Sequence, residues 1–341
     1  AVLLCVALMP LTAMAKEEPL DDGVTKIALL ISGDLGDMSF WDSAYAGLTK
    51  FAADHPEVVV DIIEMGSSDT SKYESTLTKT CNGAYDLIIV GSTDMREPLQ
   101  RAAKKKKYAD RRFIIFDTEI KDGKAADYPT VHSIMFSQNE GGYLAGTVAA
   151  LMSMEKGAPA TAFVGGTKND IINDFGYGFM QGVRDVNAAK GANLGAYNAY
   201  IGDFTNSPKG SSLATSFYES GVEVLFAAAS QAGLGCIDSA KNNDKLIIGV
   251  DSDQKYIADD VIICSMVKEV GKSIYDAVGA YLNGDASLWG TTWIADMATG
   301  YVGIGYGDAG STQQVSDAVK LDVEGLAKKI VDGEIKVETT R

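Results

Sequence analysis

Acidic and aromatic side chains recur directly after short apolar runs of this 341-residue chain. Carboxylates accept hydrogen bonds from hydroxyl and ring N–H groups, and aromatic faces hold planar rings. The combination predicts a neutral, flat, hydroxyl-rich ligand rather than a phosphate. The residues that carry it are Asp37, Phe40 and Trp41 after residues 26–31, Asp117 after residues 113–116, Phe175 beyond residues 161–164, and Asp251 after residues 245–250.

A structural role also fits some of these residues. Asp37, Asp117 and Asp251 each follow a predicted strand and precede a predicted helix, which is where an aspartate caps a helix N-terminus. Phe40 or Phe175, taken alone, fits core packing. The residue types therefore leave a binding role and a structural role open at each position.

The elements that must position these residues follow from the pattern of apolar residues. Continuous Val- and Ile-rich runs predict strands of a parallel sheet that is covered on both faces. The segments between them have apolar residues at helical spacing, and repeated strand then helix indicates a doubly wound α/β fold. The expected strands are residues 26–31, 58–63, 86–90, 113–116, 161–164, 222–226 and 245–250, and the expected helices are residues 39–53, 72–82, 140–154 and 174–189.

This alternation pauses after Phe116 and starts again at Thr161. Each half, with roughly four strands, has the size of one domain. We therefore expect two Rossmann-like lobes. In such sheets the ligand crevice lies at the carboxyl ends of the strands, which is where the acidic and aromatic residues stand.

Groups suited to catalysis or metal binding are scarce. His55 and His132 belong to no H-x-x-x-H or Cys/His set, and no G-x-S-x-G occurs. The triplet 271–273 resembles the end of a P-loop, but Met266 stands where its first glycine is needed. Residues 33–38 place acids where a dinucleotide's pyrophosphate would sit. We expect no enzymatic activity, no cofactor and no metal site.

The charge balance narrows the class of partner. The chain has 46 Asp and Glu against 30 Lys and Arg, a net charge of −16. This argues against nucleic acid and anionic lipid, because both favour basic patches. The lysine run at residues 104–107 closes a helical pattern, so we expect a solvated helix end there.

For the oligomeric state, we expect a monomer.

The N-terminal residues 1–15 are apolar and uncharged and end in Ala13-Met14-Ala15. This pattern is typical of the hydrophobic region and cleavage site of a secretory signal, and it is too short to span a bilayer. We expect a signal peptide there, a periplasmic or extracellular protein, and no lipid anchor on Cys5. The remaining cysteines are expected to be buried thiols, with a Cys236–Cys264 disulfide as the alternative: Cys81, Cys236 and Cys264.

An ordered set of short motifs runs from about residue 26 to residue 310. Its members are Gly33-Asp-Leu-Gly-Asp-Met-Ser-Phe40, residues 133–151, Phe163-Val-Gly-Gly166 with Phe175 and Gly178-Phe179, Gly233-Leu-Gly235, Ile248-Gly-Val-Asp-Ser-Asp-Gln254 and Ser265-Met-Val-Lys268. Together they resemble the basic membrane protein family, the substrate-binding lipoproteins that include purine nucleoside receptors of ABC importers.

The resemblance implies a periplasmic-binding-protein fold whose lobes close over a nucleoside, with a purine nucleoside as first choice, and a membrane permease as partner. Its three crossovers between lobes would lie near Phe136, Ser265 and Thr299. One lobe would comprise residues 24–136 plus 267–296, and the other residues 137–264 plus 299–341. Matching positions imply that Phe40 and Phe175 sandwich the base, Asp37 and Asp117 bond its polar edge, Asp251 and Lys268 hold the ribose hydroxyls, and Gly233 lets backbone approach the sugar.

Two departures from the family pattern border the expected cleft. Trp41-Asp42 stands where the family has Asn-Gln, and residues 167–174 lack the family's proline. A receptor for a flavin or a sugar on the same fold is therefore one alternative. A periplasmic nucleoside hydrolase is the alternative of a different class, but the chain has no D-x-D-x-x-x-D-D pattern for a metal site.

Overall fold

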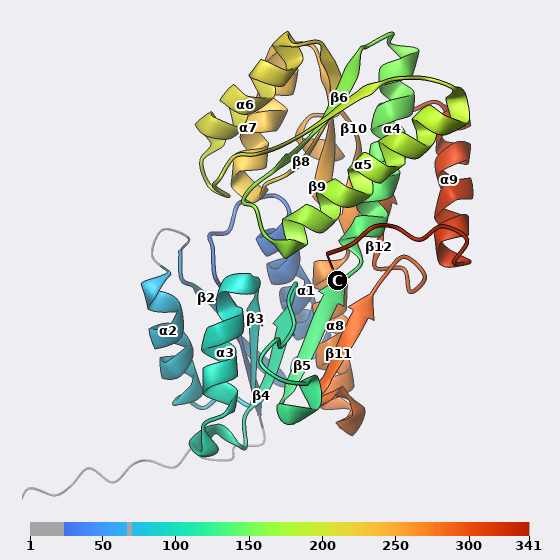
Figure 1. Ribbon diagram of the computed structural model, residues 1–341. Helices are drawn as coiled ribbons and strands as arrows, with labels where there is room; N and C mark the ends of the chain where they lie inside the picture. The colour runs from blue at the N-terminus through green and yellow to red at the C-terminus, as the bar shows by residue number, and fades with distance from the viewer. Residues whose placement is uncertain (1–23, 67–69, 341) are drawn as a thin grey trace, which may run out of the picture.

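The computed structural model describes residues 24–66 and 70–340. It has two lobes, one above the other in Figure 1, and each is built on its own six-stranded sheet. The expected signal peptide and Cys5 lie outside the described residues. The prediction of a two-lobed, doubly wound α/β fold is confirmed.

The first lobe has a wholly parallel sheet in the order β11-β5-β4-β3-β1-β2. Its central strands are buried because helices cover both faces. The strands are β1 (Thr25–Ile31), β2 (Val58–Glu64), β3 (Leu87–Gly91), β4 (Arg112–Phe116), β5 (Val131–Phe136) and β11 (Thr291–Ala295). The helices are α2 (Ser71–Cys81) and α3 (Arg96–Ala103) on one face, and α1 (Phe40–Asp54) and α8 (Val270–Leu282) on the other.

The second lobe repeats this plan in the order β12-β10-β9-β8-β6-β7, with only β12 antiparallel to its neighbour. Its strands are β6 (Ala160–Gly165), β7 (Gly195–Tyr200), β8 (Val222–Ala228), β9 (Leu246–Asp251), β10 (Ile262–Lys268) and β12 (Val302–Gly305). Its helices are α4 (Gln138–Glu155), α5 (Asp170–Lys190) and α9 (Asp317–Val331) on one face, and α6 (Ser207–Glu219) and α7 (Ser230–Asn242) on the other.

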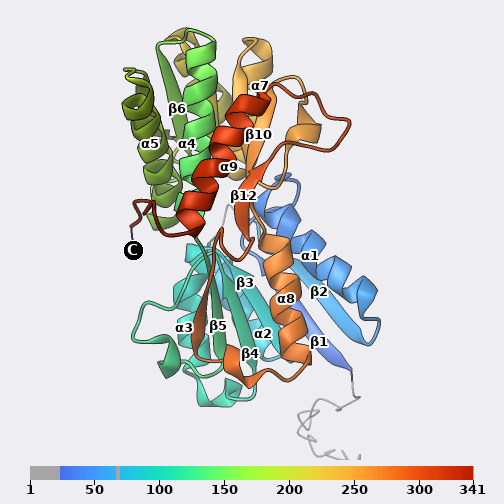
Figure 2. The same cartoon turned by 90° about the vertical axis from the view of Figure 1, so that its right-hand side faces the viewer.

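The chain passes between the lobes three times, as Figure 2 shows: from β5 to α4, from β10 to α8, and from β11 to β12. The second passage lies later in the sequence than expected. Val267 and Lys268 still pair with Asp251 and Val302 in the second sheet, whereas the expected first lobe resumes at residue 267. Lys268 is therefore the last residue of a second-lobe strand, at the edge where the two lobes meet.

Glycines bring α4 and α5 into close contact and so place the residues at the start of α5. A side chain on Gly142 would overlap with the carbonyl group of Phe175, and one on Gly178 would overlap with the carbonyl group of Asn139. Glycine at these positions lets the two helix backbones approach closely. The close packing holds Phe175 beside the crossover that follows β5.

The expectation that the cysteines are buried thiols is confirmed, and the alternative of a Cys236–Cys264 disulfide is not. Cys81, Cys236 and Cys264 are all buried and unpaired, and burial raises the pKa of the Cys81 thiol to about 11. A thiol that stays protonated is a poor nucleophile, so these residues fill the core. In the part of the chain that the structure describes, no helix combines the length and apolar character needed to cross a membrane.

Candidate functional site

A cavity of about 530 Å³ lies between the lobes, at the carboxyl ends of strands from both sheets. Its volume is in the range of small-molecule sites. Six of the eight residues singled out from the sequence line it: Phe40, Trp41, Asp117, Phe175, Asp251 and Lys268. Strand ends of both sheets thus contribute to one site.

In the lining of this cavity, a buried lysine joins two aspartates. Lys268 Nζ lies 3.0 Å from Asp117 Oδ1 in the first lobe and 3.2 Å from Asp251 Oδ1 in the second. The Lys268 side chain is 2% exposed, and each aspartate residue is 8% exposed. One ammonium faces two carboxylates, so the triad carries a net negative charge when all three groups are ionised. Its carboxylates suit hydroxyl or N–H donors of a ligand.

Burial shifts the titration of all three groups. It raises the pKa of Asp117 and of Asp251 above the ordinary aspartate range, and Lys268 only partly offsets this effect. Burial by itself lowers the pKa of Lys268, but the two carboxylates outweigh it and hold that pKa above its usual value. The ammonium therefore stays charged, while the carboxylates protonate at a higher pH than exposed aspartates do.

Aromatic rings surround the same ammonium. Lys268 Nζ lies 4.9 Å from the ring centroid of Phe40, 5.1 Å from that of Phe175 and 5.5 Å from that of Phe136. At these distances the rings attract the cation. Phe40 and Phe175 belong to different lobes, and each also packs in its own lobe, Phe40 against Phe116 and Phe175 against Phe226. Stacking of a ligand between them stays a prediction.

Backbone strain is concentrated at this cavity. Of the six described non-glycine residues with positive φ, four line it. L-residues adopt this conformation rarely, and such strain is typical of functional sites. The four are Ser92 (69°), Asp117 (57°), Ser230 (49°) and Asp251 (63°), which come after β3, β4, β8 and at the end of β9.

Asp37 and Gly233 do not line the cavity. Asp37 is fully buried, and its carboxylate accepts the backbone N–H groups of Ser39, Trp41 and Asp42 at 3.0, 3.1 and 3.2 Å. It therefore acts at the start of α1, as the structural alternative proposed. Gly233 lies in the first turn of α7, and a side chain there would meet only Ala229, at 3.8 Å. Nothing at that position requires a glycine.

The structure also brings in residues that the sequence analysis missed. Most of them follow the carboxyl end of a strand. The rule that parallel sheets bind ligands at these ends, which located Asp117 and Asp251, therefore applies to them as well. The segment after β3 was overlooked although β3 was expected, and the segment after β7 was missed because β7 was not predicted. These lining residues are Ser92, Thr93 and Asp94, then Asp203, Phe204 and Thr205, and also Thr167, Asn169, Ser230 and Gln231.

Comparison with known proteins identifies the family. The family model described as "ABC transporter substrate-binding protein PnrA-like" matches residues 24–341. The chain belongs to the Bmp family. Basic membrane protein A of Borreliella afzelii is 28% identical over 93% of each chain. The CD4+ T-cell-stimulating antigen of Listeria monocytogenes is 32% identical over 90% of this chain and 85% of that protein.

Solved structures agree on the fold of this Bmp-family protein. An ABC transporter solute-binding protein from Aeropyrum pernix K1 superposes with a TM-score of 0.82 at 24% identity, covering 93% of this chain and 94% of that chain. A carbohydrate transporter solute-binding protein from Agrobacterium radiobacter, in complex with D-arabinose, gives 0.62 at 17% identity and covers 90% and 99%. Proteins of this family bind small solutes outside the cytoplasm, work with a membrane permease and are not enzymes.

A pH titration tests whether the triad of this Bmp-family protein contacts ligand. Ionised carboxylates accept hydrogen bonds from ligand hydroxyl and N–H groups, and protonated ones do so less well. Because the pKa values of Asp117 and Asp251 are both raised, affinity should be full above them and should fall as pH drops through them, by up to about tenfold per pH unit. The decline should begin at a higher pH than the titration of exposed aspartates, which lies near pH 4. Calorimetric affinities that stay constant down to the pH at which exposed aspartates titrate would contradict it.

Proposed function

We propose that this protein binds a nucleoside, with a purine nucleoside as the first choice, between its lobes and delivers it to the membrane permease of an ABC importer. The observation that carries the proposal is the buried Asp117–Lys268–Asp251 triad beside Phe40 and Phe175. Carboxylates that can accept hydroxyl groups lie next to aromatic rings that can stack on a base. The first lobe contributes Asp117 and Phe40, and the second contributes Asp251 and Phe175. A nucleoside has both parts joined by a single bond.

Each part of the ligand has its own set of residues in this proposal. Asp251 and Lys268 hold the ribose hydroxyls, the carboxylate as acceptor and the ammonium as donor. Asp117, on the other side of the same ammonium, takes a donor on the polar edge of the base. Phe40 and Phe175 stack on the base, and Trp41 closes the wall beside them. A side chain on Gly33 would overlap with the Trp41 indole, so the glycine allows this wall to form.

The charge of the lining favours a neutral ligand. Asp34, Asp94 and Asp203 line the cavity together with the triad. Among the described lining residues, Lys268 is the one cation, and it is already paired with two carboxylates. A phosphate group would meet unfavourable charge over most of this surface. A nucleoside therefore fits better than a nucleotide.

A ligand panel tests the proposal directly. We expect a purine nucleoside at 100 times its dissociation constant to stabilise the protein by about 2.7 kcal/mol, or roughly 5 °C in melting temperature. The matching 5′-monophosphate should give no shift. Inosine should be recovered intact after incubation, because the proposed role is transport, and native mass spectrometry of the purified protein should show a retained nucleoside.

Other outcomes would redirect the assignment. A shift with riboflavin or D-ribose, and none with any nucleoside, would replace the nucleoside with a flavin or a sugar. Release of free hypoxanthine from inosine would mean that the protein is a hydrolase. A shift with inosine monophosphate equal to that with inosine would contradict the argument from lining charge.

A further inference from the structure

We propose that a set of direct hydrogen bonds between the lobes, here called the latch, holds the cleft closed and sets ligand affinity without touching the ligand. The latch joins the backbone carbonyls of Met38 and Ser39 in the first lobe to the side chains of Ser252 and Gln254 in the second, and none of these four residues lines the cavity. Only the part of its test that uses ligand rests on the proposed function.

The first-lobe half of the latch is the loop between β1 and α1. Asp37 accepts three backbone N–H groups at the start of α1, and Asp42 accepts those of Gly36 at 2.8 Å and Met38 at 2.9 Å. Met38 has a φ of 53°. These bonds and this turn hold the loop in one shape, with the carbonyl groups of Met38 and Ser39 available to the other lobe.

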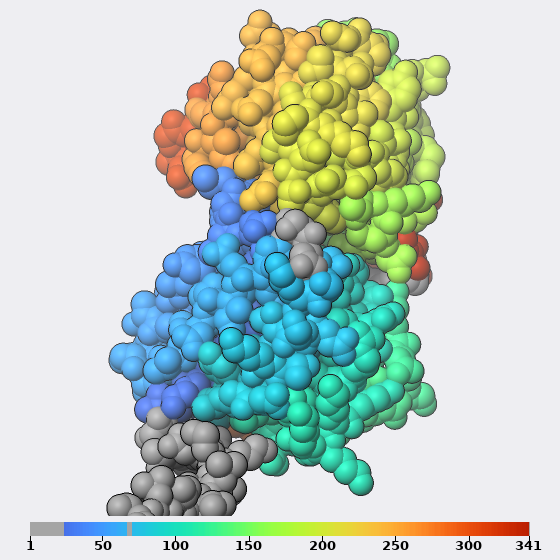
Figure 3. All heavy atoms as spheres, turned by 90° about the vertical axis from the view of Figure 1, so that its left-hand side faces the viewer, coloured from blue at the N-terminus to red at the C-terminus, as the bar shows by residue number. Residues whose placement is uncertain are grey.

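Several second-lobe side chains donate to this loop, and two of them form the latch. Ser252 Oγ donates to the Ser39 carbonyl at 3.2 Å, and Gln254 Nε2 donates to the Met38 carbonyl at 3.1 Å. Ser230 and Gln231 also donate to the loop, but they line the cavity, and the Tyr256 hydroxyl donates to Met38 Sδ at 3.6 Å. The blue segment that reaches the underside of the upper lobe in Figures 1 and 3 contains this loop. The two latch bonds join residues of different lobes that are 213 and 216 positions apart in the sequence, so they form only when the lobes meet.

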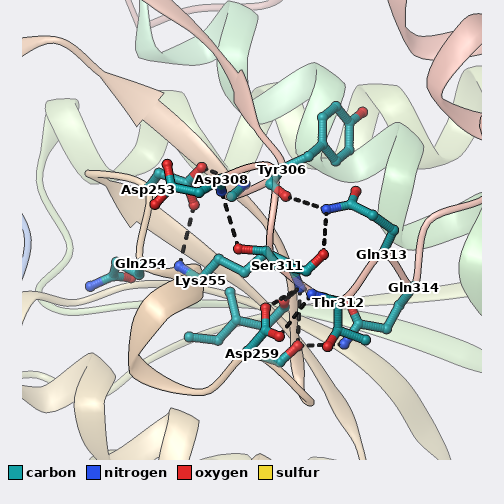
Figure 4. Close-up of polar contacts among 12 residues, drawn as sticks. Asp253, Gln254, Lys255, Asp259, Tyr306, Asp308, Ser311, Thr312, Gln313 and Gln314 are labelled. Atoms are coloured by element: carbon teal, nitrogen blue, oxygen red, sulfur yellow. Dashed lines mark hydrogen bonds and ion pairs between the residues drawn. The ribbon is translucent and has the colours of Figure 1, made fainter.

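The second-lobe half of the latch is held by hydrogen bonds within its own lobe. Gln254 is 4% exposed; its Oε1 accepts the N–H of Val250 at 2.9 Å, and its own N–H donates to Ser265 Oγ at 2.9 Å. This leaves the side-chain NH₂ group for Met38. The neighbouring Lys255 is buried and donates to the carbonyls of Ile262 and Asp259 and to Gln314 Oε1 (Figure 4). Closure therefore orders few side chains, and more of each bond energy is retained.

The latch differs from the other contacts between the lobes. Ser252 and Gln254 do not line the cavity, whereas the Lys268 triad does. The ion pair between Lys121 and Asp170 also joins the lobes, at 2.8 Å, but both side chains are about half exposed, and such pairs contribute little. A protein that binds ligand only when closed has an apparent dissociation constant equal to the intrinsic one divided by the closed fraction. Loss of the latch should therefore weaken all ligands by the same factor.

Gln254→Glu and Ser252→Ala test this proposal. The glutamate can still accept the Val250 N–H, but it places a carboxylate oxygen against the Met38 carbonyl and repels it. With spin labels on Lys79 and Ser216, which lie on α2 and α6, we expect the ligand-free variants to show longer distances than the ligand-free wild type. Nucleoside affinity should fall about tenfold for Gln254→Glu and about threefold for Ser252→Ala, by equal factors for ribo- and dideoxynucleosides.

Ser212→Ala is the matched control, because Ser212 is an exposed second-lobe serine whose hydroxyl contacts only Pro208 of its own helix. It should change neither distance nor affinity, and all three variants should melt within a few degrees of the wild type. Unchanged label distances in ligand-free Gln254→Glu would overturn the latch. This distance measurement uses no ligand, so it stands even if the protein binds no nucleoside.

Discussion

Lys268→Met is expected to weaken nucleoside binding by two to three orders of magnitude. The substitution keeps most of the side-chain volume but leaves Asp117 and Asp251 without a cation in a site where each is only 8% exposed. Removal of one partner from a buried ion pair costs about 3–5 kcal/mol, and the lower part of that range, about 3–4 kcal/mol, corresponds to roughly 10²–10³ in affinity. The ring contacts with Phe40 and Phe175 are lost as well. Titration calorimetry at pH 7.5 measures the effect.

The control and a second variant separate binding from folding. Lys328→Met removes an exposed ammonium from α9, far from the cavity, and should leave affinity unchanged. The double variant Lys268→Met with Asp251→Asn should recover part of the melting temperature of the ligand-free protein, because it no longer buries two like charges. Affinity within threefold of the wild type for Lys268→Met would place the ligand away from the triad.

Asp251→Asn is expected to weaken ribonucleosides about 10- to 100-fold and 2′,3′-dideoxynucleosides only about twofold. Hydrogen bonds to charged groups contribute about 1.5–3 kcal/mol, and this carboxylate is assigned to the ribose hydroxyls. Asparagine is the better substitution here, because the φ of 63° at this position is unfavourable for alanine and better tolerated by asparagine. Calorimetry with paired ligands that differ only in these hydroxyls measures the discrimination.

Asp244→Asn is the matched control for this substitution. Asp244 is a second-lobe aspartate that also has positive φ, at 52°, but it is exposed and does not line the cavity. Any general effect of the exchange on the backbone should appear in both variants, and the loss of ribose discrimination should appear only at Asp251. Equal losses for ribo- and dideoxynucleosides in Asp251→Asn would mean that this carboxylate only supports the local fold.

The strands that could be predicted from the sequence are those that are buried on both faces of their sheet. Residues such as 27–31 and 87–90 are buried on both faces of their sheet, so the chain is continuously apolar there. Strands β7 and β11 are largely half-exposed or exposed and lack this signal. The apparent pause between residues 116 and 161 contains β5 and α4. Strand β5 includes His132 and Ser133, which interrupt its apolar run, so it was not predicted, whereas α4 corresponds to the helix expected at residues 140–154.

The sequence by itself determined the two-lobed α/β fold, the position of the cleft and most of its chemistry, because parallel sheets place ligands at the carboxyl ends of their strands. Only the tertiary structure decided what each aspartate does. Asp37, Asp117 and Asp251 have the same local signal, yet Asp37 binds the start of α1 and the other two share Lys268. That difference depends on partners such as Lys268 and Ser230, which lie 151 and 193 residues away from Asp117 and Asp37. Local residue patterns carry no information about contacts at such separations, which arise only when the sheets are assembled and the lobes meet.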